Sequence, residues 1–589
     1  MTRISDDASL REREKLDGRI AFVAAAFALA YGFVALLDRV GAPLALVEAV
    51  APYFTILAFA ALGALLHSMR VSTYYAAGRA VPFEYAGFAL AALVAGLMLP
   101  FAPQFSGRSW LFGVAGGVFT GVAAIGFYLG PMLRKTGAVS FSELLAARFP
   151  SVATRVGVIA LACAASALIA LAGEQSAVDV LAGVLGGGRG LSAVVVGCAV
   201  LLIAGPGGLL GTIWTAAAAG AVAVVGFGWP ALMLALRGAP PFGGAADASG
   251  DAAARLEDWG ALANAPSPGA GVIVMLAVTL GIATLAPLLA PAIATQTPGR
   301  ARLAGCAAFG WTFVFAFLIA VGLAGATLSL ARQGVGQAPE RLPDAVYVAS
   351  ARGLVTICGA RAPDPASARR ACAGKSGSTG APLRATDFRV NGALFLAALP
   401  GLERMGAAAS GLLASAQIAL ALALAAAGLQ AFGTALGHEA IYRFRGNIDL
   451  TSRRLITTRL ALLTVAAAGA AASASGVFDA RALIAFALAL SAAAMAPVAA
   501  LAPWSRADDR DALYALLGGL FGMTMVILIA GDPRDGDVLA GAALAGALLG
   551  FAAGVASALS RPAGSAHGRA FVARLTRGDG AVMEPEKGA

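Results

Sequence analysis

Glu174 is an ionisable residue inside a long apolar run of this 589-residue chain, and Gln175 follows it directly. A carboxyl group that is largely removed from water can take up a proton, so Glu174 could act as a proton-binding coupling group. A structural interpretation stays open beside it, in which the carboxylate reaches water or the cation of a neighbouring helix. At ~1.5 Å per residue counted from Arg155, Glu174 stands about 28 Å along its helix. That distance places it in the outer third of a membrane or at its surface.

Thr212 and Trp214 are two further residues that could contact a solute. They follow a Pro-Gly-Gly turn at 206–208 and begin the next apolar run. Tryptophan at the start of a membrane span is commonly an anchor at the level of the lipid headgroups. Both interpretations, solute contact and membrane anchor, remain open for this pair.

Patterns that would suggest catalysis or a resident metal are incomplete. His438-Glu439 begins like the zinc-protease motif, but Tyr442 stands where the second histidine is required. The glycine clusters at 185–190 and 243–250 lack the Lys and Ser/Thr of a phosphate-binding loop. The sequence also shows no nucleophile with a base and no carboxylate pair at catalytic spacing. We therefore expect neither an enzyme nor a cofactor.

The composition excludes an ordinary water-soluble protein. Hydrophobic residues make up 59% of the chain and charged residues only 13%, against about 25% charged in globular domains. The net charge of +10 comes from cations that lie between apolar runs, rather than on one patch that could bind nucleic acid. We expect an all-α polytopic membrane protein whose partners are the lipid bilayer and a small-molecule solute. The sequence identifies no protein partner.

The apolar runs predict about fourteen transmembrane helices, since a helix needs ~20 residues to cross ~30 Å of hydrocarbon. Helix interruptions are predicted at three places: at Gly228 with Pro230, at Pro287 with Pro291, and at Pro100. A membrane protein tolerates a broken helix where the freed backbone groups line a cavity or contact protein. The predicted spans are 20–37, 48–67, 84–104, 110–132, 152–186, 191–205, 209–236, 268–295, 303–330, 402–437, 456–476, 481–503, 512–530 and 537–558.

Basic residues recur in every second connection between these spans, which is typical of connections that face the cytoplasm. They include Arg70 and Arg79, Arg134 and Lys135, Arg300 and Arg302, Arg453 and Arg454, and Arg506 and Arg510. Both ends then lie in the cytoplasm, as segment 1–19 and tail 559–589. Two long polar segments, 237–267 and 333–395, then lie outside.

Five cysteines fall into two groups. Cys163, Cys198 and Cys306 lie in or beside apolar runs, where a free thiol behaves as a small hydrophobic group. Cys358 and Cys372 lie in the polar segment 333–395. Their spacing allows a disulfide if that segment faces an oxidising exterior, and two free thiols otherwise.

Five sequence elements, in order along residues 70–480, resemble the sodium:solute symporter family, and within it the cation/acetate permease branch. The first is Ser72-Thr-Tyr-Tyr-Ala-Ala-Gly-Arg79. The second is Leu133-Arg-Lys-Thr-Gly137 with Phe141–Phe149, and the third is Gly207–Thr215. The fourth is Leu280–Leu285 with Pro298–Arg302. The fifth is Ala435–Arg443 with Arg453–Arg459.

The resemblance implies an inverted-repeat (5+5) core of the leucine-transporter type, in which a rocking motion exposes a central site alternately to each side. Its repeats would span 84–236 and 268–476, preceded by two transmembrane helices within 20–67 and followed by the helices of 481–558. The expected location is a bacterial plasma (inner) membrane. The implied function is symport of a small solute, such as the short monocarboxylate acetate, with sodium or a proton as the coupling ion.

The chain departs from the family where sodium ligands are expected. The family's Ser-Thr pair corresponds to Ala423 and Leu424, whose side chains cannot bind sodium. Other polar family positions are occupied here by Leu93, Gly96, Leu99, Ala216 and Pro287. A dehydrated cation gains little from methyl groups, so either coupling uses another ion or the chain is a non-transporting sensor or accessory membrane protein on the same scaffold.

Overall fold

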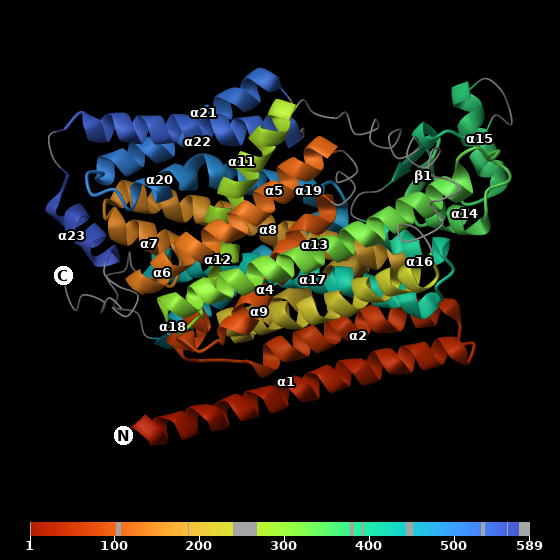
Figure 1. The fold of residues 1–589 in the computed structure, drawn as a ribbon, viewed down its shortest axis with the longest axis horizontal. Coiled ribbons are helices and arrows are strands. Elements are labelled where there is room, and N and C mark those ends of the chain that lie inside the picture. The colour runs from red at the N-terminus through yellow and green to blue at the C-terminus, as the bar shows by residue number, and fades with distance from the viewer. Residues whose placement is uncertain are drawn as a thin grey trace.

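The computed structural model is almost entirely helical (Figure 1). It describes residues 2–101, 108–186, 188–238, 268–376, 382–390, 394–442, 451–531, 536–561 and 564–576. Most of the expected external loop 237–267 and the C-terminal part of the expected tail 559–589 therefore lie outside the described residues.

The long helices of the bundle follow the predicted spans closely. They are α1 (Thr2–Arg39), α2 (Leu44–Leu65), α4 (Phe83–Met98), α5 (Arg108–Ala124), α8 (Val152–Leu185), α9 (Arg189–Leu236), α11 (Pro268–Thr284), α13 (Pro298–Gly334), α17 (Ala407–Gly433), α18 (Thr451–Ser475), α19 (Ala480–Leu490), α21 (Asp509–Ala530) and α22 (Gly536–Leu559). Shorter elements extend or connect them: α3 (Val71–Ala76), η1 (Ala77–Arg79), η3 (Ile125–Leu129), α6 (Gly130–Thr136), α7 (Phe141–Arg148), α12 (Ala286–Ile293), η6 (Thr434–Tyr442), η7 (Ser491–Met495), α20 (Ala496–Leu501) and α23 (Ala566–Leu575).

Twelve described helices are long and apolar enough to cross a membrane, and the bent pair α11–α12 makes a thirteenth span. Helix α9 runs for 48 residues, about 72 Å at 1.5 Å per residue, which is more than twice a bilayer's hydrocarbon core. Its backbone is non-helical at Gly208, where φ is 56° and ψ is −143°. A Cβ placed on Gly211 would lie 2.9 Å from the carbonyl oxygen of Ile203, whereas residues eight apart in a straight helix are ~12 Å apart. The chain therefore reverses at Gly208, as expected for 206–208, and α9 supplies two spans.

The interruption expected at Gly228 and Pro230 is wrong. Helix α9 continues through Pro230 to Leu236, because a single missing backbone hydrogen bond is tolerated within a packed transmembrane helix. The interruption expected at Pro100 is present, because the α-helix of α4 ends at Met98 and residues 99–101 form a 3-10 turn. Residues 102–107 lie outside the described residues.

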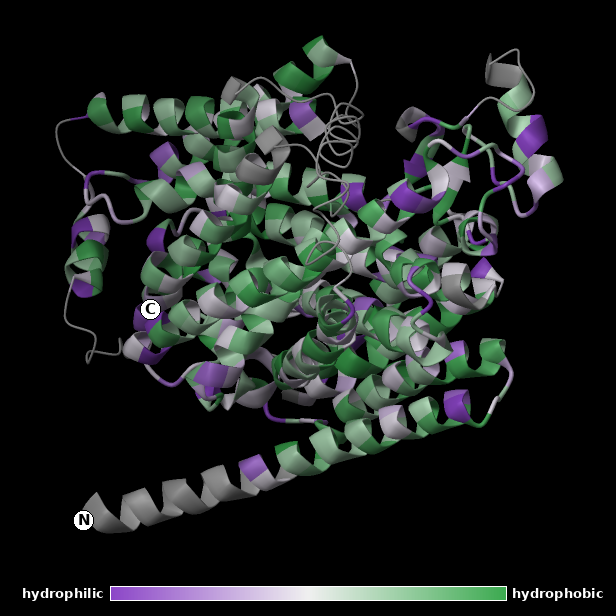
Figure 2. Ribbon diagram, turned by 45° about the vertical axis from the view of Figure 1, so that its right-hand side comes forward, coloured by the Kyte–Doolittle hydropathy of each residue, from purple (hydrophilic) through white to green (hydrophobic). Residues whose placement is uncertain are grey.

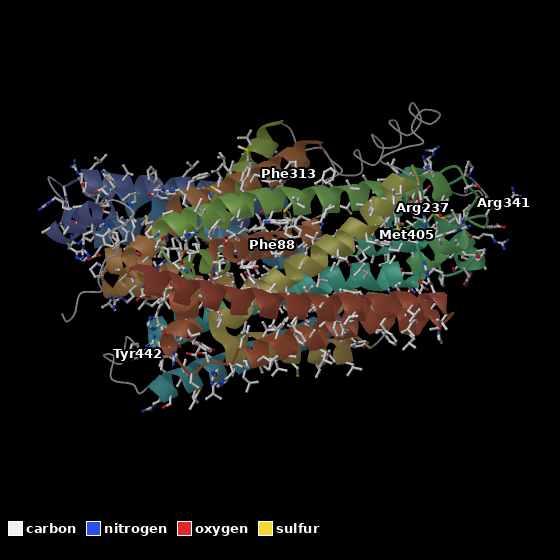
Figure 3. The ribbon with its side chains drawn as sticks, turned by 60° about the horizontal axis from the view of Figure 1, so that its bottom comes forward. Phe88, Arg237, Phe313, Arg341, Met405 and Tyr442 are labelled. Carbon is white, nitrogen blue, oxygen red and sulfur yellow. A yellow bond between two sulfur atoms is a disulfide. The ribbon has the colours of Figure 1, made fainter. Side chains whose placement is uncertain are left out.

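The bundle has two ends of different character (Figures 1 and 2). The start of α1, the helices α6 and α7, and the C-terminal helix α23 lie at one end, which we call the terminal face. A small domain lies at the other end, which we call the opposite face. Hydrophobic residues dominate the helices between the two ends, and polar residues gather at the ends (Figure 2). This distribution is that of an integral membrane protein. Among the labelled side chains, Tyr442 lies toward the terminal face and Arg237 and Arg341 lie toward the opposite face (Figure 3).

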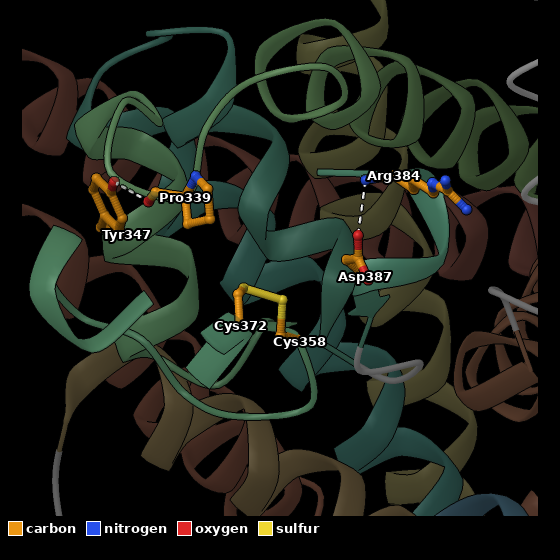
Figure 4. The surroundings of a disulfide bond; sticks show 6 residues. All are labelled: Pro339, Tyr347, Cys358, Cys372, Arg384 and Asp387. Carbon is orange, nitrogen blue, oxygen red and sulfur yellow. Dashed lines mark hydrogen bonds between the residues drawn. A yellow bond between two sulfur atoms is a disulfide. The ribbon is translucent and has the colours of Figure 1, made fainter. Parts of the chain in front are cut away.

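The domain on the opposite face is built from α14 (Asp344–Ala351), β1 (Val355–Ile357), α15 (Pro365–Ser376), η4 (Ala385–Asp387), β2 (Phe388–Val390), η5 (Phe395–Ala398) and α16 (Leu399–Leu402). Strands β1 and β2 pair antiparallel. Cys358 and Cys372 form a disulfide between the end of β1 and α15 (Figure 4). The Tyr347 hydroxyl donates to the Pro339 carbonyl at 2.7 Å nearby. The three remaining cysteines are free.

Candidate functional site

The clearest irregularity within the bundle is the break between α11 and α12. Leu285 has extended backbone angles, and the two helices meet at 48°. Pro287 follows at the second position of α12. Its ring removes one N–H and clashes with the carbonyl of a preceding helical turn, which favours a break at this point. The predicted interruption near Pro287 is therefore present, two residues earlier in the chain.

A pair of buried hydroxyl groups lies beside this break. Thr284 Oγ1 is 2.9 Å from Ser491 Oγ, and it donates to the Leu280 carbonyl at 2.7 Å. Ser491 is the first residue of η7, a π-helical segment within the α19–α20 span. Such segments occur frequently at functional sites. Hydroxyl and carbonyl oxygens without a carboxylate can bind a monovalent cation or water, whereas Ca²⁺ is usually bound with carboxylates.

The position of the family's sodium ligands is closely packed. Ala423 and Leu424 are buried in α17. A Cβ placed on Gly96 of α4 would lie 3.4 Å from the Leu424 Cβ and 2.8 Å from the Leu420 carbonyl oxygen. Helix α4 is α-helical at this level and ends at Met98. Pro100 has no N–H, so it donates no hydrogen bond to the Gly96 carbonyl. Backbone contact and methyl groups thus occupy the place where the family binds sodium.

Gln417 is a buried amide that the sequence analysis did not single out. Its side chain is 2% exposed, and both Nε2 and Oε1 lack a hydrogen-bond partner among the described residues. In a helix, residues three and four apart share a face. Gln417 therefore shares a face with Leu420, which touches Gly96 of α4, and with Ala421, whose carbonyl touches Gly173 of α8.

The side chain of Gln417 is consequently directed between α4 and α8. It lies one helical turn closer to the opposite face than the contacts of Leu420 with α4 and of Ala421 with α8. At that level the α-helix of α4 gives way to the 3-10 turn at 99–101. Ser176 lies one turn beyond Gly173 on α8, and its hydroxyl also lacks a partner among the described residues. Buried polar groups are nearly always hydrogen-bonded in native proteins. Two unpartnered groups at the end of a core helix therefore indicate a place for a polar ligand or water. Hydropathy cannot reveal this, because Gln417 is one polar residue in an apolar run.

Glu174 and Gln175 lie in a separate polar cluster between α8, α9 and α18. Glu174 is 1% exposed, and a Cβ placed on Gly469 of α18 would lie 2.2 Å from its Oε2 atom. Among the described residues, no group hydrogen-bonds this Oε2 atom. The Glu174 side chain is thus buried against α18. Both the coupling role and the structural interpretation of this carboxylate stay predictions.

Gln175 is tied into an ion-pair network beside Glu174. Its Nε2 donates to both carboxylate oxygens of Asp179, at 3.1 and 3.2 Å. Asp179 pairs with Arg189 at 2.6 Å, and Arg189 Nε donates to the Ser473 carbonyl at 2.8 Å. The cluster fixes the start of α9 against α8 and α18, and Glu174 Oε2 lies beside it without a hydrogen-bond partner among the described residues.

Thr212 and Trp214 are not part of either group. Thr212 Oγ1 donates to the Leu209 carbonyl within its own helix at 2.9 Å. The Trp214 ring packs on Tyr85 with 5.1 Å between ring centroids, near the start of α4. Trp214 is about 9 Å along its span from the turn at Gly208, whereas Glu174 is about 33 Å along α8 from the same face. Trp214 therefore lies near the terminal-face end of its span, and its role as an anchor stays a prediction.

The motifs of the first, second, third and fifth sequence elements meet at the terminal face. The Tyr75 hydroxyl lies 2.7 Å from Thr458 Oγ1. Ser142 donates to the Glu439 carboxylate at 2.8 Å, and Ser140 donates to the same oxygen. His438 Nε2 lies 3.8 Å from Glu143 Oε1. His438-Glu439 thus belongs to a polar cluster between helices, and the described residues hold no group of metal ligands.

The same cluster fixes the turn of α9 and the segment that contains α3. Arg459 donates to the carbonyls of Gly205 and Ser68, each at 3.0 Å, and Gln430 Nε2 donates to the Tyr74 carbonyl at 3.2 Å. Burial raises the pKa of the Tyr74 and Tyr75 phenols. Both phenols therefore stay neutral and can donate hydrogen bonds at physiological pH. Sequence-distant motifs are joined here into one interlocked end of the bundle.

No protein-family profile and no curated protein matches the chain. Among solved structures, a Na⁺-coupled sialic acid symporter in a substrate-bound outward-open state is similar at 15% identity, over 88% of this chain and 98% of that chain, with a TM-score of 0.62. A nucleobase-cation-symport-1 family transporter in a closed conformation is similar at 14% identity, over 86% and 100% of the two chains, with a TM-score of 0.44. The TM-score of the first of these two structures indicates a shared fold. The chain is an all-α polytopic membrane protein with a leucine-transporter-type fold.

Proposed function

We propose that this chain is a secondary active transporter that couples the movement of sodium or protons to that of a small solute. The observation that carries the proposal is the break at Leu285 inside the leucine-transporter-type fold. A discontinuous helix in such a core supplies backbone groups for binding, and it can bend as the core changes conformation. A helix with a purely structural role gains nothing from such a break, since each backbone hydrogen bond lost in a membrane costs free energy.

Two five-helix repeats are supported by which helices pack together. Helix α4 packs on α13, and the corresponding later helix α11 packs on α5. Likewise α9 packs on α17, and α19 packs on α8. The two repeats can be compared by replacing every helix with the equivalent helix of the other repeat. The first contact in each of these two pairs then becomes the second contact. The proposed repeats are residues 84–236 and 268–476, the second extended through α20 to include its fifth helix.

The proposed orientation puts the terminal face in the cytoplasm of a bacterial cell and the opposite face outside its plasma membrane. Arg79, Arg134 and Arg454 belong to connections or helix ends at the terminal face, as the positive-inside rule requires. The Cys358–Cys372 disulfide lies on the opposite face, and disulfides persist in oxidising compartments outside the cytoplasm. Charge and thiol chemistry support the same orientation.

The proposed solute is a short monocarboxylate such as acetate, with Gln417 as its principal side-chain contact. The amide Nε2 can donate to a carboxylate, and Oε1 can accept from a protonated acid. Recognition of an anion would also use backbone N–H groups and helix-end dipoles. Thr212 and Trp214 are not included in this site.

The coupling ion has two candidate positions. Sodium would need oxygen ligands, and the buried hydroxyls of Thr284 and Ser491 beside the break supply two of them. A proton would need one titratable group, and Glu174 is buried, with no described hydrogen-bond partner for its Oε2 atom. The close packing of Leu424 against Gly96 argues against sodium at the family position. The same packing favours the alternative function, a non-transporting sensor or accessory protein.

Uptake into proteoliposomes tests the proposal. Labelled acetate and related short acids are supplied with a sodium gradient at equal pH, and separately with a proton gradient without sodium. Empty liposomes are essential controls, because the neutral acid crosses lipid unaided. Gradient-driven uptake above the empty liposomes supports transport, and the effective gradient identifies the ion. If neither gradient drives uptake across the solute panel, the non-transporting function is the correct one.

A further inference from the structure

A cavity of about 240 Å³, whose lining includes neither Gln417 nor Leu285, lies near the opposite face. It is partly open and is bordered by the parts of α4, α5, α11, α19 and α22 that are nearest this face. Leu97, Val118, Val278, Ala485 and Leu539 represent the five helices in its wall. All these helices belong to the bundle, so the cavity lies within the predicted membrane-spanning region and beside the end of α4.

The wall of this cavity is apolar with one exception. Its described lining consists of Ala, Val, Leu, Met, Phe and Gly residues together with Arg481. An apolar cavity does not bind water well, since water needs two to four polar partners. An aliphatic group would gain free energy by leaving water for this wall. The lining therefore suits a hydrocarbon chain rather than a second copy of a small polar solute.

Arg481 gives the cavity a cationic edge. It is the second residue of α19, whose N-terminus carries a partial positive charge. Its side chain is 45% exposed and pairs with Asp479 at 3.3 Å, and Asp479 is exposed as well. An exposed pair of this kind contributes little free energy, so Arg481 can exchange its partner for the carboxylate of a ligand. Asp479 already shows that this helix end accepts a carboxylate, because it caps the backbone N–H of Arg481.

We propose that this cavity binds a medium-chain carboxylate, with its aliphatic chain between the helices and its headgroup at Arg481. A cavity of 150 Å³ holds benzene, so 240 Å³ accommodates on the order of ten non-hydrogen atoms by proportion. That is too small for the two acyl chains of a membrane phospholipid. The inference shares the carboxylate class with the proposed function, but it requires only binding and no transport cycle.

Binding of straight-chain carboxylates from acetate to dodecanoate to the purified full-length chain, in nanodiscs of neutral lipid, tests the inference. Each added methylene should strengthen binding about fourfold, the ratio that corresponds to burial of one CH₂ group. The gain should stop near eight to ten carbons, where the cavity is full. Equal affinity across the chain lengths, or a gain that continues through dodecanoate, would overturn the assignment to this cavity.

Three variants test the position of the ligand. Ala485→Phe fills the cavity and should abolish the chain-length dependence. Arg481→Gln should weaken carboxylate binding about tenfold and leave the matching alcohol unaffected, and Arg481→Lys should restore most of it. Arg237→Gln is the matched control, because Arg237 is an exposed arginine near the opposite face outside the cavity lining. Equal binding of alkylammonium ions, or equal losses in the Arg237 and Arg481 variants, would overturn the headgroup assignment. Competition by anionic lipid in the nanodisc would instead identify lipid as the occupant and refute the proposal.

These measurements separate the two proposals. Chain-length-dependent binding without gradient-driven uptake would support the cavity and reject transport. Uptake of acetate without chain-length-dependent binding would support transport and reject the cavity.

Discussion

Replacing Gln417 with leucine should make the protein more stable and less active. The amide is 2% exposed, and neither of its polar atoms has a described partner. A buried unsatisfied polar group costs ~1–3 kcal/mol. Leucine removes that cost, although its different shape returns up to ~1 kcal/mol through imperfect packing. The net expectation is a gain of about 1–2 kcal/mol in the free energy of unfolding.

Gln430 supplies a matched control on the same helix. It is equally buried, but its Nε2 donates to the Tyr74 carbonyl at 3.2 Å. Gln430→Leu would leave that carbonyl without this donor, and it should therefore destabilise the protein by ~1–3 kcal/mol. The two substitutions remove the same chemical group from one helix and should shift stability in opposite directions.

Thermal unfolding of the two variants in the same detergent measures the difference. We expect the midpoint to rise by about 1–2 °C for Gln417→Leu and to fall for Gln430→Leu. Solute uptake should fall at least tenfold in the Gln417 variant, because a site built to hydrogen-bond its ligand loses that bond. A lowered midpoint for Gln417→Leu would mean that the amide has a structural partner. Unchanged uptake would remove Gln417 from the solute site.

Four further predictions follow from the packing and the charges. Gly469→Ala should destabilise the protein, because the added Cβ would lie 2.2 Å from Glu174 Oε2. In a double-mutant cycle of unfolding, Glu174→Ala should largely restore the stability lost in Gly469→Ala. Additive losses of stability in the double variant would contradict the contact. Glu174→Gln should abolish the pH dependence of uptake if the proton is the coupling ion, and an unchanged pH profile would exclude this residue from coupling. Leu424→Ser should cost ~2–5 kcal/mol and create no sodium dependence of uptake, since Gly96 already packs in backbone contact with Leu420 there; sodium-stimulated uptake would refute this. Finally, partial burial raises the pKa of Asp508, but hydrogen bonds from Ser565 and the charge of Arg561 outweigh it, and the net pKa lies below the ordinary value. Because the folded pKa is depressed, this contribution to stability is complete above the unfolded pKa of ~3.9 and is lost as pH falls through the folded pKa. Hydrogen exchange around Ser565 should therefore become faster under acid conditions. Exchange that is independent of pH after correction for its intrinsic rate would contradict this prediction.

The sequence predicted the helices well because membrane spans are specified by length and hydropathy. The turn at 206–208 was expected from its Pro-Gly-Gly sequence, and the reversal at Gly208 confirms it. Proline was a less reliable signal. Pro287 accompanies a real break, whereas Pro230 lies within continuous helix. The outcome depends on whether neighbouring helices tolerate the lost hydrogen bond, and that is a property of packing rather than of the local sequence.

The contents of the site were harder to predict because they depend on helix rotation. In an almost uniformly apolar helix such as α17, periodicity gives little information about which side faces α4. Gln417 was therefore overlooked, and Leu424 was identified only through its correspondence to a family position. Glu174 was recognised as unusual from its charge alone, but its approach to Gly469 requires the three-dimensional packing of α8 against α18.

The packing of α4 against α17 constrains any coupling mechanism in this chain. Opening a sodium site at Leu424 would require these helices to separate at Gly96, where the Leu420 carbonyl already lies in contact distance of an added Cβ. Such a separation would expose methyl groups to a dehydrated cation, which gains almost no solvation from them. A cation that couples to the solute must therefore bind elsewhere. The hydroxyls of Thr284 and Ser491 lie at the break, where bending can change their geometry directly, whereas Glu174 lies on α8 against α18, two helices without such a break. Coupling through Thr284 predicts that Thr284→Val abolishes sodium-dependent uptake and leaves its pH profile intact, and coupling through Glu174 predicts the reverse.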